Sequence, residues 1–441
     1  MANTFKYQTV WTKEFQKSNW AMPIYPVIAD LRFQAGLQIG DTVKRRYRSN
    51  PIFANDLGTD GSYSPQNYVE GEESFTISKQ KEASVRIVKP EVLHTDLPAT
   101  ESYGKQLANA LYQEIDGDTL NALRLGASQS ISAGDFGGTS GDGLPVTISN
   151  IADLPVLAME KYRGANVVYD LNKRFGKLAY ENYDGMLTWI VPPQVWTQID
   201  RYLIARNTQL GDQVTTNGYQ GRFGNFNVFL SNNLPFTARL ALSVNPTDGD
   251  TITIKGVVIT FKTTVDAGTT AGQVKIASTA ALTVTNLVAF LNAPTTTVAD
   301  ATNAGYNGFG TANTLTENGY TIKKSDALHG LSATDGTTYV DILMKGTGKV
   351  TVSSSFTSGS NLFTPALQIV HSIFTIGKNV SLAVRQDPEI YDNPVGSKIA
   401  RDYVMWTVYD NKVFIDQARA SIGLKVRCDA TSFATYSNIH A

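Results

Sequence analysis

A change of amino-acid composition and hydrophobic pattern in the middle of the chain constrains its fold more than any other feature of the sequence. Residues 221–235 have the pattern of a hairpin and strand in a folded domain, and they end in the run Ser-Asn-Asn-Leu-Pro at 231–235. A stretch rich in Thr, Gly and Ser follows, and the earlier pattern resumes near 367–371. This order predicts one domain inserted into a surface loop of another. The outer domain therefore decides the function.

Length and composition bound the class of protein. The chain has 441 residues, which is long for one domain, so two or three units are expected. An apolar content of 42% argues against wholesale disorder, and a net charge of −1 gives no global basic field for nucleic acid. The single cysteine, Cys428, excludes an intrachain disulfide framework, and with only four histidines little is left for metal chemistry.

Neither a secretory signal nor a membrane span is predicted. Residues 1–6 lead into no apolar signal core. No segment approaches the roughly 18 uninterrupted apolar residues that a membrane helix needs. We therefore expect no membrane association.

The first 40 residues have the pattern of an extended arm. Large aromatic residues, among them Trp11, Phe15 and Trp20, recur there without a clean period. Pro23 and Pro26 disfavour a long helix. So many rings need a surface to pack against, and either the chain's own core or a neighbouring subunit would serve equally well.

Residues 41–92 predict a long two-stranded excursion. One limb, 42–48, is basic, and the return limb, 73–79 with 83–88, alternates apolar and polar residues around a polar tip. An isolated two-stranded ribbon is marginal in water, so this one should lie on another surface. Its basic residues suit phosphate contacts, but ion pairs with the acidic residues of the return limb, within or between subunits, are favoured. The residues concerned are Lys44, Arg45, Arg46, Arg48, Glu70, Glu72 and Glu73.

Regular elements follow on both sides of the interruption. Helices are predicted over 100–124 and 151–163, and a strand buried on both faces over 186–191 leads through Pro192 and Pro193 into another helix. Later strands near 373–376, 380–384, 403–408 and 420–426 are expected to resume the outer domain's sheet.

The insert, 239–363, predicts a small, mostly β domain of α+β type with its own core. Strands at 251–254 and 257–261 flank Lys255-Gly256, which suits a hairpin turn, and a helix is expected over 284–292. The two ends of an inserted domain should lie close together, so excision of 240–362 is expected to leave the outer fold intact.

No catalytic, cofactor-binding or metal-binding residue is predicted. The glycine-rich stretch 134–143 lacks the Gly-Lys-Ser/Thr ending of a phosphate loop. The run 114–118 faintly resembles a calcium loop, but its ligand alternation breaks and no Glu closes it. The four histidines have no nucleophile or carboxylate at a recognisable spacing.

Taken in order, these parts resemble the tailed-bacteriophage major capsid protein of the Hong Kong 97 type. The resemblance covers 1–238 and 364–430. Its most specific stretch is 221–235, and 189–195 and 374–380 also resemble the family's axial domain. It implies an α+β Hong Kong 97-type capsid fold that carries an inserted domain. The implied parts are an N-terminal arm (1–40), an E-loop (41–92), a spine helix with peripheral domain (93–164), an axial domain (165–238) and a C-terminal axial and peripheral part (364–441).

The resemblance implies a structural function. Such a chain self-assembles as hexamers and pentamers into the icosahedral head around double-stranded DNA, without sequence-specific binding. Expected partners are portal, scaffolding, and decoration or head-fibre proteins, and the expected location is the virion, with assembly in the host cytoplasm. The candidate inter-subunit contacts are Trp11, Phe15, Trp20, Lys44, Arg45, Arg46, Arg48, Glu70, Glu72 and Glu73.

Three other functions stay open from the sequence. An encapsulin-like shell would share the fold and enclose protein cargo. A different virion component, such as a tail-tube subunit, would assemble into rings or tubes. An enzyme, for instance a carbohydrate-active one with the insert as a binding module, is the third.

Overall fold

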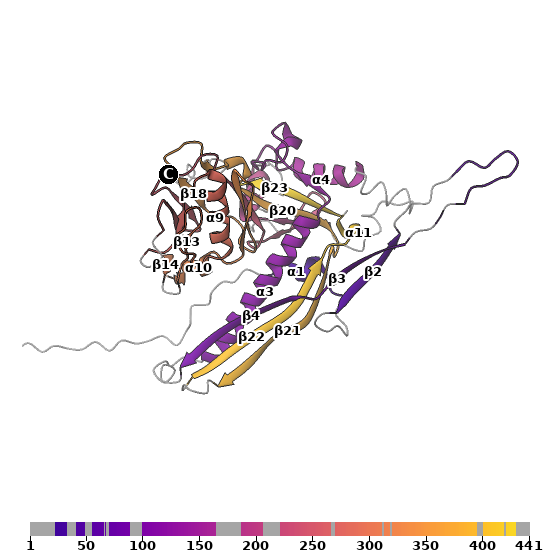
Figure 1. The fold of residues 1–441 in the computed structure, drawn as a ribbon. Helices are drawn as coiled ribbons and strands as arrows, with labels where there is room; N and C mark the ends of the chain where they lie inside the picture. Colours follow the sequence, from indigo (N-terminus) through magenta and orange to yellow (C-terminus); the bar gives the residue numbers. More distant parts are fainter. Residues whose placement is uncertain are drawn as a thin grey trace, which may run out of the picture.

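The computed structural model describes residues 23–32, 41–48, 55–65, 67, 70–88, 99–164, 187–205, 221–265, 270–310, 313–317, 320–394, 400–418 and 420–428. The fold is α+β. Its longest helix, α3 (Ala99–Gly126), matches the helix expected over 100–124. Figure 1 shows α3 running along a narrow sheet at one end and reaching a much larger sheet at the other. The helix therefore connects the two β layers.

The narrow sheet has four strands, all outside the insert. Their order is β1 (Ala29–Asp30), β21 (Val380–Pro394), β22 (Ala400–Lys412) and β4 (Lys79–Val88). Helix α3 packs on β22, β21 and β4, and this packing buries apolar residues such as Ile115 and Leu382. The strands near 380–384 and 403–408 were expected to continue the outer domain's main sheet. They form this separate sheet instead, because β22 pairs with β4.

The predicted excursion is a shorter ribbon than the sequence suggested. Strand β2 (Thr42–Arg48) pairs antiparallel with β3 (Glu70–Thr76), from Thr42 opposite Thr76 to Arg48 opposite Glu70. The second part of the expected return limb, 83–88, belongs to β4 (Lys79–Val88), which leaves the ribbon and pairs with β22. The ribbon is therefore connected directly to the narrow sheet, because β3 is followed after two residues by β4.

The large sheet has ten strands. Its main path runs β16 (Leu331–Asp335), β17 (Tyr339–Met344), β9 (Phe236–Ala241), β20 (Ile369–Ile376), β6 (Leu187–Val191), β8 (Phe226–Leu230) and β7 (Arg222–Phe223). Strands β19 (Leu362–Phe363), β23 (Ser421–Arg427) and β5 (Gln129–Ile131) join it at the side. Strand β6 is buried as expected, and its Trp189 stacks on Phe374 with ring centroids 4.7 Å apart. Helices α4 (Asp153–Gly164) and α7 (Pro193–Ile204) lie close to the predicted positions.

A separate sheet of five strands lies within the insert. Its order is β13 (Tyr306–Asn307), β12 (Gln273–Lys275), β11 (Val257–Lys262), β10 (Thr251–Ile254) and β18 (Val352–Ser355). The hairpin between β10 and β11 turns at Lys255 and Gly256, whose φ angles of 51° and 76° are the positive values that such a turn requires. Helix α9 (Ala280–Asn292) begins four residues before the predicted 284, and the small hairpin β14 (Thr314–Glu317) and β15 (Tyr320–Lys323) leads into α10 (Lys324–Ala327).

The insert does not have a separate core. Strand β17 lies inside 239–363, yet it pairs with β9 from Phe236 to Ala241 and so extends the outer sheet. One apolar cluster runs continuously from Ile190 and Phe236 in the outer sheet to Phe261 and Phe290 in the insert. The two ends of the insert do lie together, since Leu362 and Phe363 pair with Ala241 and Leu240. The amino-acid composition changes at the boundary of the insert, whereas the sheet and the apolar core continue across that boundary.

Candidate inter-subunit interface

The β2–β3 ribbon carries the predicted ion pairs on its exposed face. Lys44 Nζ lies 2.9 Å from Glu72 Oε1, and Arg46 lies 4.0 Å from Glu70. The hydrogen bond from Lys44 lowers the pKa of the Glu72 carboxyl. Because all four side chains are well exposed, these pairs hold the ribbon's register only weakly and stay accessible to another surface.

Two other charged residues of the ribbon face its own chain. Arg45 lies over the Phe414 ring, with its guanidinium carbon 5.3 Å from the ring centroid. Glu73 accepts a hydrogen bond of 3.1 Å from the backbone N–H of Ile415, the first residue of α11 (Ile415–Ala418). Phe75 packs on the same Phe414 ring, with centroids 6.0 Å apart. The base of the ribbon is thus fixed to the molecule that carries it.

The far end of the excursion exposes large apolar side chains. Leu57 is 68% exposed and Tyr63 is 80% exposed, and both belong to the projecting loop drawn in dark purple in Figure 1. A local turn organises the loop, since the N–H of Gly58 donates to Ser62 O at 2.9 Å and Asp60 accepts from the Ser62 hydroxyl at 2.6 Å. A projecting apolar pair on an ordered turn is typical of a contact surface.

Sequence reasoning missed these two tip residues. The signal was present, because a Leu and a Tyr interrupt residues 55–65, which are otherwise Asn, Asp, Gly, Thr, Ser and Pro. Isolated surface apolar residues are common, however, and only the projection of residues 55–65 away from the rest of the chain gives Leu57 and Tyr63 weight.

Two buried carboxylates of α3 bind segments that are distant from the helix in sequence. Asp116 accepts hydrogen bonds of 2.7 Å from the backbone N–H groups of Ile24 and Tyr25 and one of 2.8 Å from Asn233. Burial raises the pKa of the Asp116 carboxyl despite these donors. The run 114–118 lies within helix α3 and does not form the loop that it faintly resembled. Its Asp116 side chain holds the backbone of residues 24–25 and Asn233.

A second carboxylate of the same helix joins three more segments. Asp118 lies 3.1 Å from Lys79 Nζ at the start of β4 and 3.0 Å from Lys345 Nζ just after β17, and it accepts a 2.9 Å hydrogen bond from the Tyr409 hydroxyl. Burial opposes its charge, but the two lysines outweigh burial and lower the pKa of the Asp118 carboxyl. The network locks the narrow sheet and the insert to one helix.

The ten candidate inter-subunit contacts stay predictions, because the structure describes a single chain. Trp11, Phe15 and Trp20 lie outside the described residues. The backbone of Arg48 pairs with Glu70, but its side chain also lies outside the described part. In the segments that the structure describes, no group of three or more His, Cys, Asp and Glu side chains could hold a metal ion. None of the helices in those segments is long and apolar enough to cross a membrane.

Comparison with known proteins gives a likeness in structure alone. No family model matches the sequence, and no curated protein matches it. The chain is similar to one from Mycobacterium phage Che8, with a TM-score of 0.53 at 9% identity, over 96% of this chain and 98% of that one. It is also similar to a chain in the capsid structure of the cyanophage P-SCSP1u, with a TM-score of 0.50 at 10% identity, over 95% of this chain and 93% of that one. The α+β, Hong Kong 97-type fold expected from the sequence is thereby confirmed over almost the whole chain.

Proposed function

We propose that this chain is a major capsid protein whose copies self-assemble into the icosahedral head of a tailed bacteriophage around double-stranded DNA. The observation that carries the proposal is the likeness to the cyanophage capsid chain, which spans 95% of this chain and 93% of the other. Because nearly all of each chain is covered, the likeness extends over most of the subunit. The shared part is not one common module.

The geometry of the ribbon supports the proposal. Its base is fixed to its own chain through Arg45, Glu73 and Phe75, while its tip presents Leu57 and Tyr63 to the outside. Exposed apolar side chains at the tip of the ribbon do not stabilise an isolated molecule, whereas a subunit in a shell can bury them against its neighbour. The exposed pairs Lys44–Glu72 and Arg46–Glu70 can exchange partners with a neighbouring copy.

The finer assignments follow from the same proposal. The copies would form hexamers and pentamers, with portal, scaffolding, and decoration or head-fibre proteins as partners. The arm, apart from residues 24–30, which pack on their own chain, would bind neighbouring subunits. The net charge of −1 suits a shell that encloses DNA without gripping its phosphates. The chain would act as a structural component of the virion, assembled in the host cytoplasm, and not as an enzyme.

Electron microscopy of the purified chain tests the proposal. We expect closed shells from the unmodified protein, and DNA inside the native particle should resist nuclease. Stacked rings or tubes would contradict a capsid function and favour a tail-tube subunit. Shells that hold protein cargo instead of DNA would favour an encapsulin-like compartment.

A pair of matched variants tests the role of the tip. The double variant L57D/Y63D should lose shell formation and keep its melting temperature, because both side chains are exposed in the single chain. The control V258D changes a residue that is 46% exposed on the insert and should still form shells. Normal shells from L57D/Y63D would show that the tip makes no essential contact.

A further inference from the structure

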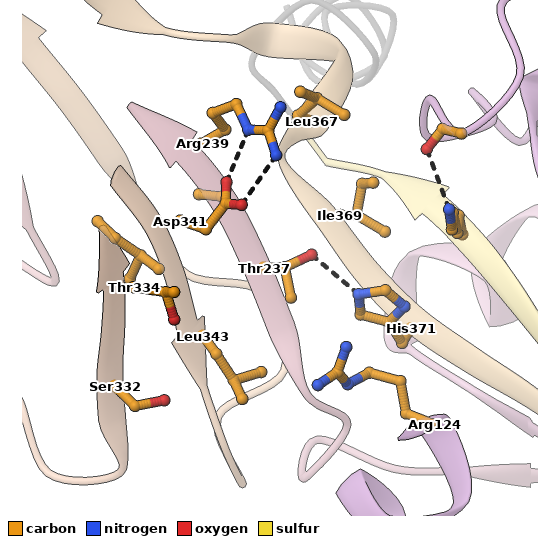
Figure 2. Close-up of a pocket in the computed structure, with 14 residues that line it drawn as sticks. Arg124, Thr237, Arg239, Ser332, Thr334, Asp341, Leu343, Leu367, Ile369 and His371 are labelled. Carbon is orange, nitrogen blue, oxygen red and sulfur yellow. Dashed lines mark hydrogen bonds and ion pairs between the residues drawn. The ribbon is translucent and has the colours of Figure 1, made fainter. Parts of the chain in front are cut away.

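A pocket of about 400 Å³, lined by both charged and apolar side chains, opens on one face of the large sheet. Figure 2 shows its lining, which comes from the end of α3 and from strands β9, β17, β20 and β16. The side chains on which its chemistry depends are Arg124, Thr237, Arg239, Asp341, His371 and Lys425. Three cationic side chains and one carboxylate are therefore among the lining residues.

The strand register explains why this face is polar. Asp341 of β17 stands opposite Arg239 of β9 and also opposite Thr334 of β16, so a polar row crosses three strands. Their neighbours in sequence point to the opposite face, where Ile342 and Val340 are buried in the apolar core that α9 also enters. Alternation along each strand thus separates a covered apolar face from an open polar one.

Among the described residues, Asp341 is the one acidic side chain of the lining, and it is already paired. Arg239 donates two hydrogen bonds to Asp341, of 2.7 Å and 2.8 Å, and its guanidinium lies 3.8 Å from the centroid of the Tyr339 ring. A two-point pair of this kind is geometrically satisfied. Asp341 therefore neutralises Arg239 and leaves the other cations of the pocket without a counter-charge.

Arg124 is the cation with the poorest compensation. It lies in the last turn of α3, and its Nε donates to Asn121 Oδ1 at 3.0 Å. Among the residues that the structure describes, no carboxylate forms an ion pair with it. Burial alone lowers the pKa of its guanidinium, yet an arginine in a protein keeps its charge. The carbonyl end of the helix offsets only part of the cost of burying this charge.

The residues around Arg124 add to the positive field. Lys425 Nζ donates to the carbonyl of Gly141 at 3.3 Å, and no ion pair of Lys425 is found within the described segments. His371 is buried, and its Nε2 lies 2.8 Å from Thr237 Oγ1. Burial, followed by the charges of Arg124 and Lys425, lowers the pKa of His371 to about 3, so this ring is neutral near pH 7. Two cations thus act on a neutral imidazole with no anion between them.

We propose that this pocket binds a phosphate group, held by the charges of Arg124 and Lys425 with the Thr237 hydroxyl beside them. Two unneutralised cations match the charge of a phosphate near pH 7, which is about −1.5 to −2. A guanidinium binds two oxygens of such an oxyanion, and an ammonium acts as a point charge on a third. The proposal is independent of the capsid function, because it rests on the chemistry of this face alone.

The experiment is a titration of the full-length chain with inorganic phosphate. The protein is first exchanged into phosphate-free buffer, and sodium chloride holds the ionic strength constant, so that general screening is the same throughout. Isothermal titration calorimetry and the melting temperature are recorded at each concentration. We expect a saturable response with one site per chain, accompanied by a rise in melting temperature.

Three variants assign the site. R124Q and K425Q should each weaken phosphate binding at least tenfold, and the rise in melting temperature should shrink accordingly. The matched control K323Q removes an exposed lysine of β15 outside the pocket and should bind as the unmodified chain does. K425Q keeps the test decisive if R124Q fails to fold.

A thymidine dinucleotide, which carries one phosphodiester, identifies the source of the phosphate. Binding of both probes would mean that the pocket accepts a nucleic-acid backbone, and binding of inorganic phosphate alone would mean a free ion. Either result supports the site. The absence of a saturable response to both probes would overturn it, and so would an equal response in R124Q, K425Q and the unmodified chain.

Discussion

Asn233 donates a hydrogen bond of 2.8 Å to Asp116, and this contact joins the Ser-Asn-Asn-Leu-Pro strand end to the buried side of helix α3. The other oxygen of the carboxylate accepts from the backbone of Ile24 and Tyr25. Asn233 also donates to Gln113 of the same helix. The segment that precedes the insert and residues 24–25 of the arm therefore meet at one side chain.

Replacing Asp116 tests this junction. D116A leaves the buried N–H groups of Ile24 and Tyr25 and the amide of Asn233 without their acceptor, so the free energy of unfolding should fall by about 2–4 kcal/mol. D116N keeps one acceptor oxygen and should cost less, since burial already disfavours the charge of this group. Urea denaturation measures both variants. An unchanged midpoint for D116A would show that the junction contributes nothing.

Gly117 offers a test in which the usual sign reverses. Alanine normally stabilises a helix interior by about 1 kcal/mol relative to glycine. A Cβ on Gly117, however, would lie 2.9 Å from the Cα of Gly346, where the backbone after β17 crosses the helix. G117A should therefore lower the melting temperature. The control A110G, at an exposed position of α3, measures the helix propensity alone and should also lower it. A stabilised G117A would contradict the close approach.

His329 and Glu114 form a pH-dependent contact between the insert and α3. His329 Nε2 lies 3.3 Å from Glu114 Oε2, and this hydrogen bond raises the pKa of the imidazole. The His329 bond, with Lys81, lowers the pKa of Glu114 to about 2. The histidine's contribution is fully present below its ordinary pKa of 6.5 and is lost as the pH rises through the higher folded value. The glutamate's contribution is present above its ordinary pKa of 4.5 and is lost toward pH 2.

We therefore expect the contact to be strongest between these two ordinary pKa values. The His329 side chain is 72% exposed, so the stabilisation should stay below about 1 kcal/mol. Titration of the imidazole by NMR is the suitable measurement, with H329Q to assign its signal. E114Q should lower the pKa of His329 toward its ordinary value, and an unchanged titration curve would show that the contact is absent in solution.

A charge exchange separates the two roles of the ribbon's ion pairs. K44E places two like charges side by side, and because both groups are exposed the melting temperature should hardly change. If the pair also contacts a neighbouring copy, K44E should slow or abolish shell formation and the double variant K44E/E72K should restore it in part. Assembly followed by light scattering distinguishes these outcomes. Normal assembly of K44E would confine Lys44 to an intrachain role.

Excision of the insert should behave differently from the sequence-based expectation. Deletion of 240–362 removes β17, the strand that covers β9 along its whole length. It also removes Phe261 and Phe290, which share an apolar cluster with Phe236 and Ile190. The outer fold should then lose its cooperative melt or melt at a much lower temperature. A cooperative transition near that of the full chain would show that the outer sheet is stable without these strands.

Local pattern was enough to predict most elements. The helix over 99–126, the strand at 187–191 that leads into the helix at Pro193, and the turn at Lys255-Gly256 all follow from periodicity, proline placement and turn chemistry. Pattern failed where the choice of strand partner depended on distant residues. Residues 79–88 alternate as a ribbon strand should, but they pair with β22, more than 300 positions away in sequence.

The candidate site divides in the same way. The basic run in 42–48 and the acidic residues in 70–73 predicted the ion pairs of the ribbon, because cross-strand neighbours interact whatever the rest of the chain does. It did not indicate that Arg45 and Glu73 face Phe414 and Ile415, since those contacts need the narrow sheet to be in place.

By itself, the sequence determined that the chain carries an α+β fold interrupted by a stretch of different texture, with a charged ribbon ahead of a long helix. Periodicity and composition are local properties, and they survive in any tertiary arrangement. Only the tertiary structure decided that the interruption shares a sheet and a core with its host, that Asp116 joins the arm to the strand end, and that Arg124 faces an open pocket. Each of these depends on contacts between residues that are distant in sequence, and a local pattern does not specify which distant residues pair or become buried together.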